Sequence, residues 1–434
     1  MVDSQQRADQ LVDVLVSEFG ELMAQDPAAF RRKFRKMAAT PFAFYRGSAC
    51  VYYADLNGLA DPFLDERTSG VWIHGDLHAE NFGTYLNSEG VLVFNVNDFD
   101  EAYVGPFIWD LKRFAASVAL IGYAKALSDT VIGDLVAGYA RTYVSELRAI
   151  AAGGEEAIGS LTLDTTDGVL RDVLQRARLN TRVALLDEQT VIEDYDRRFA
   201  MSDGVYLVDA PTRAEVEAAF AAYLPTLPSW DGSHSPQYSI KDVVMRKGVG
   251  IGSAGLPSYN VLLEGHTQAL ENDVIIYMKQ GQTPAVSRWI TDPKVKAYFK
   301  HQGHRTSESQ RALQAHADAW AGYTELRGVG QVVAEVSPYA ADLDWSDVNE
   351  LPDLTSVVNY LGRATARMHS VADDESSHDL VNFSTEEAIV AAISRDEDGF
   401  VDTLVDFAHS YGARARADHQ IFVDLFRNGK FPGL

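Results

Sequence analysis

Cysteine is almost absent from this sequence, because Cys50 is the only one among 434 residues. One thiol cannot form an intrachain disulfide and cannot supply a thiolate metal cluster. Basic residues are also scarce: 38 Lys and Arg stand against 62 Asp and Glu, for a formal net charge of −24. Such an acidic excess disfavours binding to nucleic acids and to anionic membrane surfaces. We therefore expect neither nucleic acid nor a membrane among the partners.

Long apolar segments are absent as well. No uninterrupted apolar run reaches the roughly 20 residues that a transmembrane helix requires. The opening stretch MVDSQQRADQLVDVLVSEFG predicts an acidic amphipathic helix and lacks the basic start and apolar core of a signal peptide. There is no internal repeat and no low-complexity tail. These features predict a cytoplasmic globular protein, and none of them indicates an oligomeric state.

What the chain does contain is a change of pattern near residue 232. Before it, helical spacing dominates residues 5–39 and 108–149, while residues 71–73 and 90–96 predict short strands. The Pro/Ser/Gly-rich stretch LPSWDGSHSP then marks a boundary. Three strand-like runs follow: QYSIKDVVMRK, SYNVLLEG and DVIIYMKQ.

A helix over ESQRALQAHADAWAGY and two short strands near 323–327 and 331–336 complete this β-rich block. From Leu354 the pattern is helical to the end of the sequence. We therefore predict an α+β protein with a β-rich region placed between two helical ones. The predicted regions are 1–232, 233–345 and 346–434.

A glycine-rich segment, GVGIGSAG, lies between the first two strand-like runs. Glycines let backbone N–H groups approach phosphate oxygens closely. A dinucleotide-binding turn needs a helix directly afterwards, whereas here the strand SYNVLL follows. Strand, glycine loop and strand is the arrangement that covers ATP phosphates in protein kinases. The residues assigned to this loop are Gly248, Gly250, Gly252, Ser253 and Gly255.

Lys279 ends the third strand-like run, where a kinase keeps the lysine that holds the α- and β-phosphates. Glu308 is a candidate for its helix partner, and Glu325 or Glu264 serve in other registers. The alternative interpretation is structural: a glycine hairpin followed by a solvated lysine at a strand end.

The segment HGDLHAENFG, residues 74–83, has the spacing of a phosphotransferase catalytic loop. Phosphoryl transfer needs a carboxylate to orient the attacking hydroxyl and oxygen ligands to hold Mg²⁺. Asp76 and Asn81 have the kinase spacing D-x-x-x-x-N, which assigns the hydroxyl to Asp76 and the metal to Asn81. Asp98 follows the strand GVLVFNV and precedes Phe99, which is the place of the metal-binding aspartate.

HGDLHAEN matches every fixed position of H-G-D-x-H-x-x-N and so resembles the aminoglycoside phosphotransferase and choline kinase branch of the protein-kinase-like fold. NDFDEAYVGPFIWDL has the register of the strand, turn and D-L helix start that follow in that branch. The resemblance implies ATP and Mg²⁺ as cofactors. Asp100 stands where that branch has glycine, so it is a second candidate metal ligand or a change to the usual geometry.

The order of these motifs is reversed relative to ordinary kinases, because the glycine loop and Lys279 follow the catalytic loop. YLGRATARMHSV, residues 360–371, resembles the helix that normally precedes that loop. We therefore predict a circularly permuted, bilobal protein-kinase-like fold with a mainly helical large lobe and a small antiparallel β-rich nucleotide lobe. With FAFYRG and RKGVGIGSAG, the chain resembles the bacterial family DUF2252. That family usually has Glu-Ala after the lysine, where Gln280-Gly281 stand here.

Three further residues have two interpretations each. Arg46, in FAFYRG, contacts a phosphate or substrate anion, or pairs with a structural acid. His74 and His78 brace the catalytic loop or contact substrate. His74 and Asp76 also fit part of a two-His, one-carboxylate iron site, although that site normally belongs to an all-β barrel.

The function that these motifs favour is ATP- and Mg²⁺-dependent phosphoryl transfer to a hydroxyl of a small molecule. The acidic residues Glu80, Asp100 and Glu101 around the loops suit a cationic acceptor. A nucleotide-binding regulatory module without turnover is the alternative from another class, and a protein kinase is a third possibility. The acceptor itself is not indicated by any motif.

Overall fold

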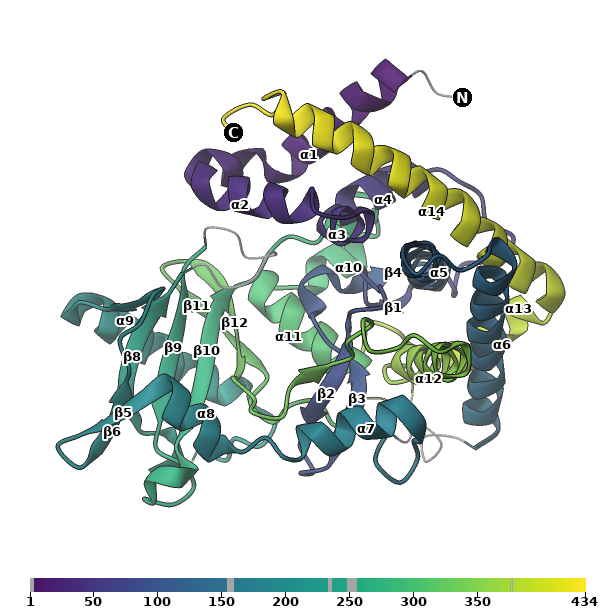
Figure 1. The fold of residues 1–434 in the computed structure, drawn as a ribbon. Helices are drawn as coiled ribbons and strands as arrows, with labels where there is room; N and C mark the ends of the chain where they lie inside the picture. Colours follow the sequence, from purple (N-terminus) through teal and green to yellow (C-terminus); the bar gives the residue numbers. More distant parts are fainter. Residues whose placement is uncertain (1–3, 154–159, 233–235, 248–255, 375, 377) are drawn as a thin grey trace.

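The computed structural model describes residues 4–153, 160–232, 236–247, 256–374, 376 and 378–434. It is a mixed α+β structure, and all strand pairs among the described residues are antiparallel. The largest sheet has six strands. Figure 1 shows this sheet on one side and a larger group of helices on the other. Within the described part of the chain, no helix has the length and apolar character needed to cross a membrane.

Four helices open the chain: α1 (Ser4–Gln25), α2 (Pro27–Met37), α3 (Pro41–Gly47) and α4 (Ala49–Leu56). The helix predicted over residues 5–39 is therefore divided between α1 and α2. Asp26 caps α2, because its carboxylate accepts the Ala29 N–H at 2.8 Å. Pro27 follows and has no N–H with which to continue the hydrogen bonds of α1.

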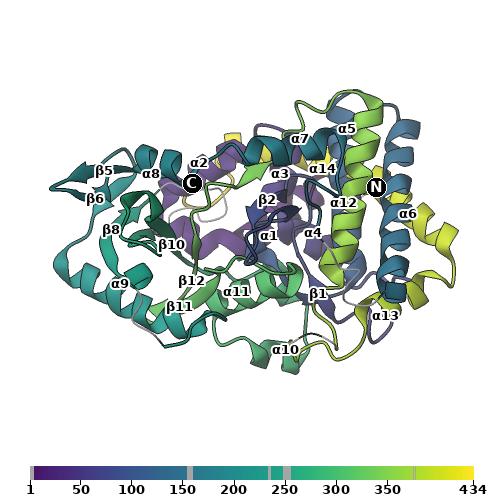
Figure 2. The same cartoon turned by 90° about the horizontal axis from the view of Figure 1, so that it is seen from below.

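The remaining long helices come from opposite ends of the sequence. α5 (Phe107–Ala124) and α6 (Asp129–Gly153) match the helical pattern predicted for residues 108–149. The last part of the chain contributes α12 (Leu351–His369), α13 (Thr385–Ile393) and α14 (Glu397–Arg427). α12 packs along α6, and α14 packs against α5 and α6 (Figures 1 and 2). These helices share one hydrophobic core with α1 to α4, so the two ends of the chain fold as a single helical unit.

The six-stranded sheet has the order β11-β12-β10-β9-β8-β7. Its strands are β7 (Val205–Leu207), β8 (Ile240–Arg246), β9 (Ser258–Leu263), β10 (Val274–Gln280), β11 (Gly322–Leu326) and β12 (Val329–Glu335). Side chains alternate between its faces. On β10, Ile276 and Met278 pack under α9 (Ala210–Tyr223), whereas Ile275 joins a small cluster on the opposite face. The three predicted strand-like runs and the two short strands that follow them correspond to β8 to β12.

The sheet unit begins earlier in the sequence than residue 233. β7 extends the sheet beside β8, and α9 supplies Val216, Phe220 and Tyr223 to its core. Leu186 of α8 (Arg182–Gln189) and Phe199 of β6 (Asp196–Phe199) pack on the other face. These elements all precede residue 232, so the Pro/Ser/Gly-rich stretch lies within the sheet unit. The β5–β6 hairpin is formed by Thr190–Glu193 and Asp196–Phe199.

Smaller elements join the two units. β1 (Val71–Ile73) pairs with β4 (Tyr103–Gly105), and β2 (Phe82–Leu86) pairs with β3 (Leu92–Val96) and β13 (Ala341–Asp342). α11 (Gln302–Leu313) lies between β10 and β11 in sequence and contacts β11, β12 and the 3₁₀ turn η1 (Phe99–Glu101). The rest are α7 (Gly168–Ala177), α10 (Pro293–Tyr298), η3 (Leu224–Thr226), η4 (Pro236–Tyr238), η5 (Leu270–Asn272) and η6 (Ala285–Arg288).

Candidate functional site

Two antiparallel pairs of strands bring the two acidic segments of the sequence together. β1 leads into the loop of residues 74–81, and β2 leaves it. β3 leads into the segment of residues 97–102, and β4 leaves it. Because β1 pairs with β4 and β2 pairs with β3, the two loops lie side by side between the pairs. The Asn97 N–H donates to the Asn81 carbonyl at 3.1 Å, which continues the β2–β3 pairing into the loops.

Asp110 at the start of α5 holds the beginning of the first loop. Its carboxylate accepts the backbone N–H of His74 at 2.6 Å and of Gly75 at 2.9 Å. His369 of α12 lies 3.3 Å from the same carboxylate, and Tyr143 of α6 hydrogen-bonds to His369 at 2.8 Å. These groups are buried, so the loop is tied to helices from both ends of the chain. This arrangement restricts the path of the backbone ahead of Asp76.

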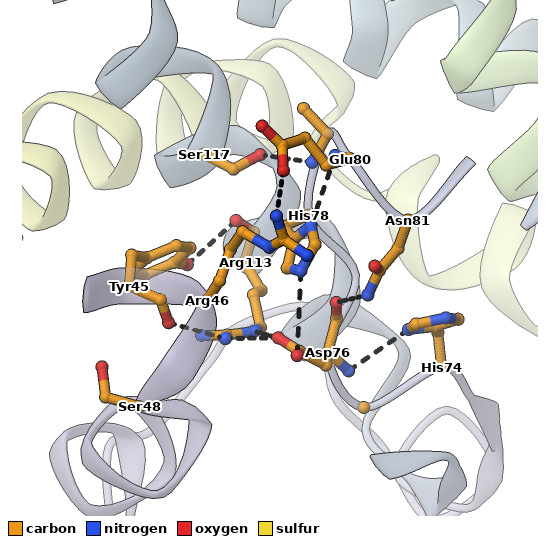
Figure 3. A network of polar contacts seen from close by, with 12 residues as sticks. Tyr45, Arg46, Ser48, His74, Asp76, His78, Glu80, Asn81, Arg113 and Ser117 are labelled. Atoms are coloured by element: carbon orange, nitrogen blue, oxygen red, sulfur yellow. Dashed lines mark hydrogen bonds and ion pairs between the residues drawn. The ribbon is translucent and has the colours of Figure 1, made fainter. Parts of the chain in front are cut away.

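Asp76 forms an ion pair with Arg113, a fully buried arginine of α5 (Figure 3). The Arg113 Nε–H donates to Asp76 Oδ1 at 2.5 Å, and the guanidinium also donates to the Tyr45 carbonyl at 3.1 Å. Burial raises the pKa of Asp76, while the Arg113 charge acts in the opposite direction. Asn81 donates from Nδ2 to the Asp76 carbonyl at 2.9 Å, which shapes the turn between the two residues. Arg113 therefore fixes the position of the carboxylate at the cleft.

The two histidines of the loop have structural contacts. His74 Nε2 donates to the Asn97 carbonyl at 2.7 Å, and its Nδ1 accepts the Asp76 N–H at 3.3 Å. Both ring nitrogens of His74 are thus engaged, which leaves none for the iron site considered above. His78 Nδ1 accepts the Glu80 N–H at 3.2 Å, and Nε2 lies 3.8 Å from Asp76. Burial and the nearby Arg46 charge hold the pKa of His78 well below its usual value, so this ring is neutral.

The second loop places two carboxylates at the cleft. Asp98 adopts a left-handed backbone conformation, with φ 62° and ψ 74°, which aspartate tolerates better than most residues. The Asp98 side chain is exposed to the cleft, and reduced hydration there together with the charge of Asp100 raises its pKa. Asp100 pairs through Oδ2 with Lys279 Nζ at 3.1 Å, whereas its buried Oδ1 has no hydrogen-bond partner among the described residues. Adjacent carboxylates with an unsatisfied oxygen favour a cation.

Lys279 reaches this loop from the sheet. It lies on β10, and the alternation of side chains places Tyr277 and Lys279 on the face opposite Ile276 and Met278. Burial opposes the charge of Lys279, but the neighbouring Asp100, Tyr277 and Asp98 outweigh it and raise the pKa of the ammonium. Lys279 therefore remains protonated.

A cleft of about 2170 Å³ separates the sheet from the helical unit. Among the predicted site residues, its lining includes Arg46, Asp76, His78, Asn81, Asp98, Asp100 and Lys279. Lys279 and Asp98 thus line one cleft although they are far apart in sequence. Residues 248–255, the predicted glycine loop, lie outside the described part of the chain. The residues that flank it, Arg246 at the end of β8 and Ser258 at the start of β9, line the same cleft.

The structure does not bring Glu308 to Lys279. Glu308 lies on α11 and pairs with Arg311, one turn along the helix, at 3.0 Å. Among the described residues, the ion pair of Lys279 is with Asp100 instead. The candidate pairing of Glu308 with Lys279 is therefore not formed. The reason is that α11 directs Arg305, and not a glutamate, toward the acidic loop. Arg46 forms its ion pair with Glu80, at the edge of the cleft.

Three basic residues at this site were not singled out by sequence analysis. Arg113 interrupts the apolar helix FIWDLKRFAASVAL, and Lys33 lies on the apolar face of α2; each was visible as a charge at a core position. Arg305 had no such signal. It donates to the carbonyls of Ala102 at 2.6 Å, Asp100 at 2.8 Å and Gln282 at 2.9 Å, and so joins η1 to the sheet unit.

The fold and this cleft define a mixed α+β protein whose acidic loops face a lysine-bearing antiparallel sheet. The family profile described as "Uncharacterized protein conserved in bacteria (DUF2252)" matches residues 25–425, and the chain belongs to this family. The match spans the helical unit, the sheet and the cleft between them. Neither the curated proteins nor the solved structures contain a significant match to the chain.

Proposed function

We propose that the protein is an ATP- and Mg²⁺-dependent phosphotransferase that acts on a hydroxyl group of a small molecule. One observation carries this proposal: Asp76, Asn81 and Asp98 from two neighbouring loops face the same cleft as Lys279 from the sheet. Phosphoryl transfer requires this set of groups, because catalysis depends mainly on positioning and on stabilising phosphate charge. An ATP-dependent reaction also fits a cytoplasmic location.

The proposal includes a circularly permuted protein-kinase-like fold. Its support is the run β8, β9, β10, in which the third strand bears the lysine and a helix, α11, follows before the next two strands. The catalytic loop precedes this sheet in sequence, and α12, which follows it, packs beside that loop through His369 and Asp110. In this interpretation the helical unit is the large lobe, and the sheet unit is the nucleotide lobe.

Each residue has a role in the proposed reaction. Lys279 holds the α- and β-phosphates. The glycine segment of residues 248–255 is predicted from its sequence to cover them. Asp76, positioned by Arg113, accepts a hydrogen bond from the acceptor hydroxyl and orients its oxygen for attack on the γ-phosphorus. The P–O bond to the β-phosphate breaks as the new P–O bond forms, and the hydroxyl proton passes to Asp76. Neutral His78 adds no positive charge beside this carboxylate.

The residues at the cleft fit a magnesium ion. Asn81 uses Nδ2 for the Asp76 carbonyl, which leaves its Oδ1 as a ligand. Asp98 supplies a carboxylate, and Asp100 Oδ1 is buried and unpartnered within the described structure. This donor set is all oxygen, which is the chemistry that Mg²⁺ prefers. When bound, the ion neutralises charge on the β- and γ-phosphates.

The acidic residues that suggested a cationic acceptor have other contacts. Glu80 pairs with Arg46, and Asp100 pairs with Lys279. Glu101 accepts the Ala285 N–H at 2.6 Å, and burial together with the charge of Asp76 raises its pKa to about 8. Two of these three charges are therefore neutralised by partners, and the third is largely protonated at neutral pH. They give a cationic acceptor little support.

A nucleotide-binding regulatory module without turnover is the second candidate function. The observation that favours it is that both key charges are already paired, Asp76 with Arg113 and Lys279 with Asp100. The first pair positions a carboxylate, but the second must open before Lys279 can contact phosphates. A module that binds nucleotide without transfer would need only the opening of the Lys279–Asp100 pair.

The decisive experiment separates nucleotide binding from transfer. Asp76→Asn should bind MgATP with near wild-type affinity and lower the rate of transfer by about 10²- to 10⁴-fold, as for other positioned acid–base groups. Asp98→Asn should instead weaken the Mg²⁺ dependence of nucleotide binding. Calorimetric titrations with and without Mg²⁺ measure nucleotide affinity and its dependence on the metal. A radiolabelled assay across an acceptor library measures the rate of transfer. Nucleotide binding with no transfer by wild type would favour the regulatory module, and no nucleotide binding would refute both functions.

A further inference from the structure

Lys33 is a buried lysine in the wall of the cleft. It lies on α2 with only 7% of its surface exposed, on the same face as Phe30, Phe34 and Met37, which belong to the core. Lysine is rarely buried to this extent unless it is paired. Unlike its apolar neighbours, Lys33 lines the cleft that contains Asp76 and Asp98.

The ammonium of Lys33 has aromatic contacts but no anionic partner among the residues that the structure describes. Its Nζ lies 3.9 Å from the centroid of the Phe19 ring and 5.6 Å from that of Phe30. Within the described structure it makes no hydrogen bond and no ion pair, although a buried charge is costly without one. A cation–π contact offsets part of this cost and leaves the N–H donors free.

Nearby carboxylates do not satisfy Lys33. Glu18 pairs with Arg288 at 2.8 Å, and Glu101 accepts the backbone N–H of Ala285. Burial lowers the pKa of Lys33, while the charges of Glu18 and Asp76 act in the opposite direction. Lys33 is thus within electrostatic range of Asp76, yet no described residue forms an ion pair with it.

We propose that Lys33 binds an anionic group, a carboxylate or phosphate, on the acceptor molecule. This inference rests on the proposed phosphotransferase function and specifies its substrate class: a small molecule that carries both a hydroxyl and an anion. The hydroxyl lies at Asp76, and the anion lies against α2 and accepts hydrogen bonds from Lys33. A charge-assisted hydrogen bond formed away from bulk water stabilises such a complex. The same subsite repels a cationic acceptor.

The first test compares Lys33→Met with Arg32→Met. Both substitutions remove one positive charge from α2, but Arg32 is exposed and does not line the cleft. Glycerate, glycerol 3-phosphate, glycerol and choline are titrated by calorimetry into protein saturated with Mg²⁺ and a non-hydrolysable ATP analogue. Glycerate or glycerol 3-phosphate should bind more tightly than glycerol and choline. Lys33→Met should lower the affinity for that anion at least about 10-fold. Arg32→Met should leave the affinity for the anion unchanged. Comparison of glycerate with glycerol 3-phosphate distinguishes a carboxylate subsite from a phosphate subsite.

A second measurement uses the unmodified protein and requires no correct guess of acceptor. Lys33 is labelled by reductive methylation with formaldehyde and dimethylamine–borane, which release no carboxylate, in the presence of the same nucleotide analogue, and peptide mass spectrometry follows the rate. Acetate or inorganic phosphate should slow labelling of Lys33 several-fold and leave the exposed Lys294 unaffected. Equal labelling of Lys33 with and without anions, or preferred binding of choline, overturns this inference. Analogue binding, measured separately, shows whether the proposed nucleotide function stands in either case.

Discussion

Gly75 shows how closely the two acidic loops approach each other. Its φ of +77° is in the left-handed region, and a Cβ placed there would lie 2.0 Å from the carbonyl oxygen of Glu101. The contact is between backbone atoms, so no side-chain rotation can relieve it. Glycine at this position therefore permits the loop of residues 74–81 to lie against the turn that bears Asp98 and Asp100.

Gly75→Ala should destabilise the protein much more than Gly90→Ala. Gly90 has the same φ of +77°, but a Cβ there would meet nothing within 4 Å. Gly90→Ala thus measures the cost of the backbone conformation alone, about 1–2 kcal/mol. The clash at Gly75 should add about 3 kcal/mol or more, because the loops must separate. Denaturant unfolding measures both variants, and equal losses of stability would show that the loops do not need this close contact.

At the scale of elements, α11 connects the sheet unit to the acidic turn η1. Arg305 has its guanidinium buried among carbonyl groups of Asp100, Ala102 and Gln282. Burial lowers the pKa of Arg305 to about 10, so it remains charged at neutral pH. The planar guanidinium has several donors in a fixed geometry, which lysine cannot reproduce. A shift of α11 would therefore move the turn that bears Asp98.

Arg305→Met should loosen η1 and weaken nucleotide-dependent Mg²⁺ binding. The expected loss of stability is about 2–4 kcal/mol, because buried carbonyls lose charge-assisted partners. Hydrogen exchange of residues 99–105 should rise, as followed by mass spectrometry. Arg311→Met is the matched control, since Arg311 lies on the same helix and donates to the carbonyl of Thr226 on the sheet side at 2.8 Å. If both variants raised hydrogen exchange at η1 equally, α11 would stabilise η1 without a specific contribution from Arg305.

At the scale of the whole molecule, the Lys279–Asp100 ion pair connects the two units across the cleft. Lys279 comes from β10 and Asp100 from the helical unit's acidic turn, with Nζ and Oδ2 3.1 Å apart. In the proposed reaction, phosphates take the place of Asp100 beside Lys279. Nucleotide binding then replaces one contact between the units with several, so it should close and stabilise the cleft.

MgATP should raise the melting temperature of the wild-type protein and reduce its radius of gyration. A ligand at 100 times its dissociation constant adds about 2.7 kcal/mol of stability. Lys279→Met should lose most of both effects, whereas Lys294→Met, at an exposed position on α10, should retain them. Differential scanning fluorimetry and small-angle X-ray scattering measure the two quantities. An unchanged response of Lys279→Met would remove this lysine from the nucleotide site.

Much of the local structure could be predicted from the sequence. The runs around β8, β9 and β10 are rich in Val, Ile and Tyr, as is typical of strands that are buried on both faces, and the helices α5, α6 and α12 follow apolar periodicity. The family was also predictable, because its motifs are contiguous in sequence. Two predictions differ from the structure: the boundary at residue 232, because β7 and α9 belong to the sheet unit, and the pairing of Glu308 with Lys279. The contacts of α9 with the sheet and the direction of Arg305 depend on packing between distant elements.

The sequence by itself determined which chemical groups are available: carboxylates and an amide at fixed spacing in one segment, and a lysine at the end of a strand in another. It also determined the alternation of side chains that turns Lys279 away from the core of the sheet. Only the tertiary structure decided which groups meet. The pairing of β1 with β4 and β2 with β3, the ion pair of Asp76 with Arg113 and the placement of Lys33 in the cleft wall all join separate segments. Local pattern cannot specify such contacts, because their energy arises from burial and charge that exist only after the segments have packed together.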